Sequence, residues 1–205
     1  MRTLDLDTPA GPAQVVLDVT SDARGVLVLG HGAGGTVESA DLLAVRQACL
    51  GAGIAVARVT QPYRVAGRKA PPAAATLDTA WRAVIAALGR RRELAGRPFV
   101  YAGRSSGARV ACRTAAEPNL RPAAVAVVAL AFPVHPPGKP ERSRLDELAA
   151  VPVPVLVVQG RSDPFGMPPP AAGREVVEVA GNHSLAASVT TLGTIVADWI
   201  TGRLG

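Results

Sequence analysis

Short runs of consecutive apolar residues alternate along this chain with longer segments in which apolar residues recur every three or four positions. Short apolar runs bounded by Gly or Pro are typical of strands that are buried on both faces of a parallel sheet. The predicted strands are residues 4–6, 15–19, 25–29, 54–59, 99–102, 124–130, 153–158 and 175–179. The first two are expected to form a hairpin.

The segments between these strands carry helical patterns, at residues 41–50, 77–88, 108–116, 142–150 and 192–200. The clearest is the second, where Leu77, Trp81, Val84, Ile85 and Leu88 recur at the spacing of one helix face. Alternating strands and helices predict an α/β fold, with a mostly parallel central sheet flanked by helices. Residues 1–205 are expected to form one domain.

Composition suits a soluble globular protein, with 48% hydrophobic and 19% charged residues. The apolar runs are too short to span a bilayer, and Asp5 and Asp7 stand where a signal peptide would be apolar. We therefore expect a cytoplasmic protein with no membrane contact. Cys49 and Cys112 lie in predicted helices, where a packing role is favoured over a disulfide.

The net charge of +6 does not point to a nucleic acid. The basic residues are scattered, and the cluster Arg90-Arg91-Arg92 has no interleaved aromatic residues that could stack on bases. His31, His135 and His183 have no metal-ligand spacing, so neither a metal nor a cofactor is predicted. The expected partner is a small molecule.

Gly103-Arg104-Ser105-Ser106-Gly107 matches the pattern G-x-S-x-G, between a predicted strand and a predicted helix. In that context the pattern predicts a nucleophile elbow, a sharp turn that exposes the serine hydroxyl. A motif centred on Ser106 would lack both glycines, so Ser105 is the candidate nucleophile. The alternative is a passive serine in a glycine-rich turn.

A serine nucleophile needs a base, and the base needs a carboxylate that orients it. In hydrolases built around such an elbow, the acid and then the histidine follow the serine in the chain. Asp163 follows the strand 153–158, and His183 follows the last strand, whereas Asp146 and Asp198 lie within predicted helices. We predict Asp163 as the acid and His183 as the base. The alternatives are a solvated loop acid and a surface histidine.

Gly30-His31-Gly32-Ala33-Gly34-Gly35 follows the strand 25–29, at the place where this fold builds an oxyanion hole. The predicted donors are the backbone N–H groups of Ala33 and Ser106. His31, Gly32 and Arg104 are candidate substrate contacts. For His31, however, bracing of the loop is favoured over a direct part in the reaction.

Five stretches occur together and in order: His31–Gly35, Gly103–Arg109, Pro133–Glu141, Gln159–Gly166 and Gly181–Ser184. Over roughly residues 25–200 the chain resembles the predicted hydrolases related to a testis-expressed protein and to a subunit of an animal histone-acetyltransferase complex. The resemblance implies an α/β-hydrolase fold and a triad of Ser105, Asp163 and His183. Ser106 departs from it, since a larger residue is usual there. Dienelactone hydrolases are more distantly similar but use a cysteine nucleophile.

The sequence thus predicts a serine hydrolase that cleaves an ester-like bond of a small acyl substrate through an acyl-enzyme. The alternatives are an inactive interaction or scaffold protein, and an acyltransferase or perhydrolase that uses the same triad. Residues 131–153 hold only a Pro-rich loop and one predicted helix, which leaves no room for a lid domain. Short acyl groups are therefore expected.

Overall fold

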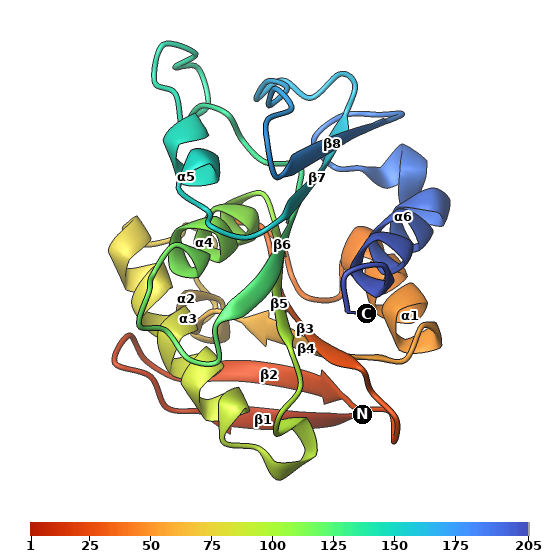
Figure 1. Cartoon of the computed structure of the whole chain (residues 1–205). Coiled ribbons are helices and arrows are strands. Elements are labelled where there is room, and N and C mark those ends of the chain that lie inside the picture. Colours follow the sequence, from red (N-terminus) through yellow and green to blue (C-terminus); the bar gives the residue numbers. More distant parts are fainter. Residues whose placement is uncertain (205) are drawn as a thin grey trace.

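A computed structural model describes residues 1–204, which fold around an eight-stranded sheet (Figure 1). The strands are β1 (Arg2–Leu6), β2 (Ala13–Asp18), β3 (Gly25–Gly30), β4 (Ile54–Thr60), β5 (Phe99–Arg104), β6 (Ala124–Leu130), β7 (Val155–Gly160) and β8 (Arg174–Val179). The helices are α1 (Ala40–Gly51), α2 (Pro62–Val65), α3 (Ala74–Gly89), α4 (Ser106–Ala115), α5 (Leu145–Ala149) and α6 (Val189–Thr201), and 3₁₀ turns lie at Arg92–Leu94 and Ala186–Ser188.

The strands lie in the order β1-β2-β4-β3-β5-β6-β7-β8. β2 pairs antiparallel with β1 and with β4, and all other neighbouring strands are parallel. The predicted mostly parallel α/β sheet and its N-terminal hairpin are confirmed. Because the carboxyl ends of parallel strands meet at one edge, the loops that follow β3, β4, β5, β7 and β8 gather there.

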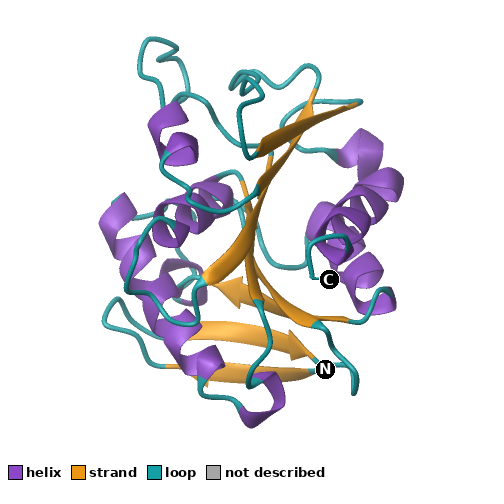
Figure 2. Ribbon diagram, viewed as in Figure 1, coloured by secondary structure: helices purple, strands orange, loops and turns teal. Residues whose placement is uncertain are grey.

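Helices cover both faces of the sheet (Figure 2), with α3, α4 and α5 on one face and α1 and α6 on the other. The strand β3 shows why its sequence is apolar throughout. Val26 and Val28 pack into the core under α3 and α4, whereas Leu27 and Leu29 pack under α1 and α6. Every residue of β3 is buried, so a polar side chain there would need a hydrogen-bond partner within the core.

The predicted helix face that begins at Leu77 is buried along its whole length, as expected. Two elements begin later than predicted. The helix placed at 142–150 begins only at Leu145, because the chain before it turns and Arg144 N donates to Val134 O at 2.7 Å. The strand placed at 153–158 begins at Val155, because Pro154 has no N–H for a ladder hydrogen bond.

The segment between β6 and β7, residues 131–154, contains only α5 and loops. This agrees with the prediction of a chain without a lid domain. The segment after β4, for which no helix is predicted, starts with one, since Pro62 begins the short helix α2. Proline suits that first helical position, since the N–H that it lacks would have no partner within the helix.

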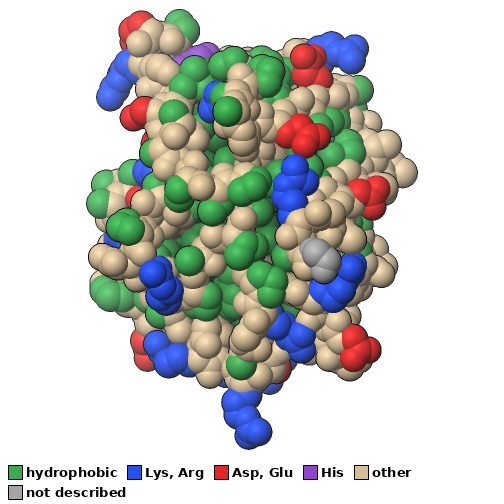
Figure 3. Space-filling view, viewed as in Figure 1, with side chains coloured by type: hydrophobic (Ala, Val, Ile, Leu, Met, Phe, Trp, Pro, Cys, Tyr) green, Lys and Arg blue, Asp and Glu red, His purple; other side chains and the backbone are tan. Residues whose placement is uncertain are grey.

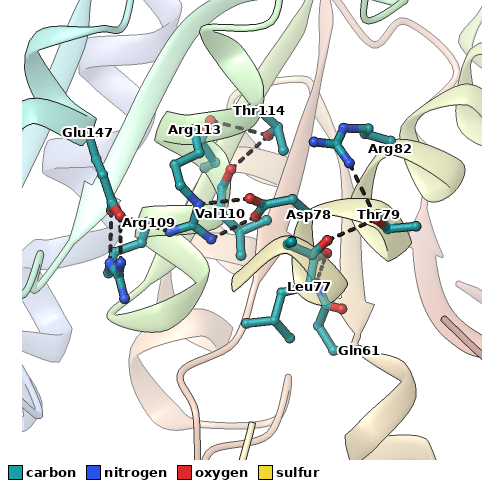
Figure 4. Close-up of polar contacts among 12 residues, drawn as sticks. Gln61, Leu77, Asp78, Thr79, Arg82, Arg109, Val110, Arg113, Thr114 and Glu147 are labelled. Atoms are coloured by element: carbon teal, nitrogen blue, oxygen red, sulfur yellow. Dashed lines mark hydrogen bonds and ion pairs between the residues drawn. The ribbon is translucent and has the colours of Figure 1, made fainter. Parts of the chain in front are cut away.

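Ion pairs tie the helix α4 to its two neighbours (Figure 4). Arg113 contacts Asp78 of α3 at 2.7 Å and Glu147 of α5 at 3.2 Å, and Arg109 pairs with the same Glu147. All four side chains are at most about a fifth exposed, so solvent screens these pairs less than it screens surface pairs. The helix behind the elbow is thereby anchored on both sides.

Cys49 and Cys112 are both free and buried, as the packing role predicts. Burial raises the pKa of each thiol to about 12. Within residues 1–204, no helix is both long and apolar enough to cross a membrane. On the face drawn in Figure 3, basic and acidic side chains are dispersed among polar and apolar ones.

Candidate active site

Ser105 stands at the turn between β5 and α4, at the carboxyl edge of the sheet. Its backbone has φ +53° and ψ −110°, a conformation that side-chain-bearing residues rarely adopt. Ser105 N donates to Leu130 O at 2.8 Å, which anchors the turn to the neighbouring strand β6. The strained strand–turn–helix expected of a nucleophile elbow is therefore present.

The two glycines of the motif are needed because backbones meet around the turn. A Cβ added at Gly103 would lie 2.3 Å from the carbonyl carbon of Gly107. A Cβ added at Gly107 would lie 2.7 Å from the carbonyl carbon and oxygen of Gly30, in the strand β3. The elbow and the end of β3 therefore lie so close together that no residue larger than glycine fits at positions 103 and 107.

Loops that follow β7 and β8 bring two more predicted residues to Ser105. His183 Nε2 lies 2.9 Å from Ser105 Oγ, although the two residues are 78 positions apart. His183 Nδ1 lies 2.8 Å from Asp163 Oδ2. Because a carboxylate only accepts, Nδ1 carries the proton and Nε2 is left to accept from the serine hydroxyl. The Asp163 side chain is 1% exposed and that of His183 is 20% exposed.

Phe165 and Gln159, which the sequence reasoning missed, surround the carboxylate of Asp163. Phe165 N donates to Asp163 Oδ1 at 2.9 Å, and its ring meets that of His183 edge-on with centroids 4.5 Å apart. Gln159 Nε2 donates to Asp163 Oδ2 at 2.9 Å. A signal for Gln159 was present in the sequence, since it is a lone polar residue after the apolar run Val155–Val158.

His31 stabilises the loop after β3 through hydrogen bonds. This side chain is 2% exposed, and its Nδ1 contacts Gly32 O at 2.7 Å while Gln61 N donates to its Nε2 at 3.1 Å. The backbone donor fixes Nε2 as the acceptor, so Nδ1 carries the proton. Burial lowers the pKa of His31 below its usual 6.5, against the opposing effect of the Gly32 carbonyl. These contacts favour the bracing role over a substrate contact.

Tyr63 holds the same loop from the side and was also missed by the sequence reasoning. Its hydroxyl donates to Ala33 O at 2.6 Å, and burial raises its pKa to about 12. Gly32 lies against the elbow, since a Cβ there would be 3.6 Å from Ser105 Cβ. Ala33 and Ser106, the predicted oxyanion donors, are both partly exposed, and their role stays a prediction.

The guanidinium of Arg104 contacts two other groups of the protein. Its Nε lies 3.0 Å from Asp41 Oδ2, at the start of α1, and its Nη2 donates to His183 O at 3.0 Å. The Arg104 side chain is 18% exposed and that of Asp41 only 4%. The contact of Arg104 with substrate stays a prediction. The observed contacts favour a different role, in which the guanidinium fixes the loop that carries His183.

A cavity of about 350 Å³ lies beside the site at the same edge of the sheet. Gln61, Tyr63, Arg68 and Leu77 contribute to its walls, together with the turn between β1 and β2. Tyr63 lines this cavity and also contacts the loop after β3 through Ala33 O. Within residues 1–204, no cluster of three or more His, Cys, Asp or Glu side chains could hold a metal ion.

The family model of the alpha/beta hydrolase domain matches residues 23–190. No curated protein matches the chain. The narrower resemblance to the group of the testis-expressed protein finds no support in these comparisons and stays a prediction.

Many solved structures are similar to this one, and they include three hydrolases from different organisms. A serine hydrolase without a lid from Xanthomonas campestris has 24% identity and a TM-score of 0.69, over 97% of this chain and 94% of that one. An esterase from Pyrococcus furiosus has 13% identity and a TM-score of 0.79, over 100% and 93%. A dienelactone hydrolase from Anabaena variabilis has 20% identity and a TM-score of 0.73, over 98% and 95%. At these identities the similarity shows a shared fold.

Proposed function

This chain belongs to the alpha/beta hydrolase domain family, and from that premise we propose that it is a serine hydrolase that cleaves an ester-like bond. One observation carries the proposal. Ser105 Oγ, His183 and Asp163 form a continuous chain of hydrogen bonds, 2.9 and 2.8 Å long, that starts on a strained turn at the sheet edge. A structural serine would need neither the strain nor the aligned imidazole.

In the proposed reaction Ser105 Oγ attacks the ester carbonyl while His183 Nε2 takes the hydroxyl proton. Asp163 stabilises the imidazolium that forms and stays ionised. The backbone N–H groups of Ser106 and Ala33 would donate to the oxyanion of the tetrahedral intermediate. As the intermediate collapses, His183 returns the proton to the leaving alkoxide and an acyl-enzyme remains. A water then attacks the acyl-enzyme, with His183 again as base, and releases the acid and the free serine.

The proposed substrates are small esters. The segment 131–154 supplies only α5 and loops above the site, so a long acyl chain would bury little apolar surface, at about 25 cal/mol per Å². We therefore expect kcat/KM across a series of p-nitrophenyl esters to peak at short chains of roughly C2 to C4. A peak at C8 or beyond would contradict the open site.

A fluorophosphonate probe tests the proposed nucleophile, because it labels only an activated serine. The wild type should be labelled and Ser105→Ala should not, with a loss of turnover of about 10⁴–10⁶. Ser106→Ala is the matched control and should still be labelled. A folded wild type that resists the probe would favour the alternative, an interaction protein on a hydrolase fold.

A further inference from the structure

The side chain of Gln159 faces a group of oxygen atoms at the end of β7. It is fully buried, and its Nε2 lies 2.9 Å from Asp163 Oδ2, 3.0 Å from Phe132 O and 2.8 Å from Gly166 O. A carboxamide nitrogen has two protons, so three acceptors share two N–H donors. The reversed amide would bring Oε1 against all three oxygens, which excludes it.

Burial of the Gln159 carboxamide destabilises the fold, and packing alone does not explain why a glutamine stands here. Gln159 Oε1 has no hydrogen-bond partner in the described part of the chain. An unsatisfied buried polar atom destabilises a fold by about 1–3 kcal/mol, whereas an apolar side chain would suit the apolar strand around it. A glutamine at this position is therefore explained by the hydrogen bonds that its Nε2 donates, above all the one to the buried carboxylate of Asp163.

Asp163 receives three donors from three directions. Phe165 N binds Oδ1, whereas His183 Nδ1 and Gln159 Nε2 both bind Oδ2. Because Gln159 also binds the carbonyls of Phe132 and Gly166, it links the carboxylate to the end of β6 and to the loop after β7. Rotation of the Asp163 side chain away from His183 would break the contact with Gln159 as well.

We propose that Gln159 is a positioning residue, which holds Asp163 Oδ2 against His183 Nδ1 and thereby keeps His183 in the tautomer that accepts the serine proton. The consequence for the reaction rests on the proposed function. The consequence for the histidine does not, since the tautomer is a property of the resting protein. Gln159 itself touches no reacting atom.

The decisive experiment measures both consequences in Gln159→Met, which keeps the length of the side chain and removes its donors. Loss of a partner that orients a metal-ligating side chain typically lowers activity by about 10–100-fold, and we expect a loss of the same order where the partner orients Asp163. We expect that loss in kcat/KM for p-nitrophenyl acetate and in the rate of fluorophosphonate labelling. Long-range ¹H–¹⁵N NMR of the three histidine rings should show His183 moving from the Nδ1–H toward the Nε2–H tautomer, as it should in Asp163→Asn.

Gln61→Met is the matched control. Gln61 is also a buried glutamine just beyond a strand end, with its Nε2 bonded to a carbonyl (that of Leu77) and its Oε1 unpartnered within the described residues. It has no carboxylate partner there, so this variant should leave the His183 tautomer unchanged. If Gln159→Met does not fold, Gln159→Leu also removes the donors, adds no charge and should shift the tautomer in the same direction.

The outcomes separate the two proposals. A loss of activity with an unchanged tautomer would mean a merely structural role and would overturn the inference, as would full activity. A wild type that the probe does not label would overturn the proposed function, and the tautomer of Gln159→Met would still decide whether Gln159 positions Asp163.

Discussion

The elbow at Ser105 and the loops that carry Asp163 and His183 meet at one point, but they are held in place differently. The elbow lies between central strands and is fixed by backbone packed on backbone, around Gly103 and Gly107. The two loops follow β7 and the edge strand β8. Their backbones meet at Gly160, where an added Cβ would lie 2.5 Å from Asn182 O, but side chains, chiefly Gln159 and Arg104, make the contacts that reach Asp163 and the backbone of His183.

This difference predicts two kinds of failure. A change at the elbow meets backbone atoms that cannot move without the sheet, so it should act on folding. A change in a side chain that holds the loops removes a directional contact without a collision between backbones, so it should act chiefly on chemistry. The following variants test that division.

The largest effect is expected from Gly103→Ala. Its Cβ would lie 2.3 Å from the backbone of Gly107, and neither strand nor helix can retreat. We expect a loss of about 3 kcal/mol in the free energy of unfolding, the upper end for an overpacked site, with labelling of Ser105 abolished. Gly51→Ala is the control, since no atom lies within 4 Å of its Cβ, and urea unfolding should find it unimpaired. An elbow that stays stable with alanine would contradict the interlocked packing.

Asp163→Asn should slow turnover by up to about 10⁴, because the amide leaves His183 in the wrong tautomer. Circular dichroism and the unfolding midpoint should show a folded chain. Asp146→Asn, on the exposed face of α5, is the control and should keep turnover within about twofold. Equal losses in the two variants would remove Asp163 from the proposed mechanism.

Arg104→Gln should lower kcat/KM by about tenfold, because the His183 loop loses its guanidinium partner. It should also destabilise the fold, since the carboxylate of Asp41 is left buried and unpaired. The double variant Arg104→Met/Asp41→Leu should regain stability without regaining activity. If only anionic esters lose activity, and through KM, Arg104 contacts substrate instead.

The smallest effect concerns the pH dependence of stability through His31. Burial lowers its pKa below 6.5, so the folded state binds the proton more weakly than the unfolded state does. The contribution of His31 is therefore complete above pH 6.5 and is lost as the pH falls below it. Between pH 7.5 and 5, the wild type should lose more unfolding free energy than His31→Gln. Parallel losses would mean that His31 is not held neutral.

The long-range contacts that support the site from outside the triad are what the sequence did not predict. Tyr63 bonds to a carbonyl 30 residues before it, and Arg104 to a carbonyl 79 residues after it. Arg104 stands beside the nucleophile and was predicted to contact substrate, yet a carboxylate at the start of α1 and the His183 loop engage it. These partners depend on how the loops pack at the edge of the sheet, and a local sequence pattern does not predict that packing.

The sequence by itself determined the order of strands and helices, the elbow around Ser105, and which acid and histidine follow it. Those features are local, because apolar runs define buried strands and two glycines allow one sharp turn. Only the tertiary structure decided how Asp163 and His183 are aimed, through Gln159, Phe165 and Arg104. A directional hydrogen bond depends on positions to within a fraction of an ångström, and those positions are set only when all the layers have packed.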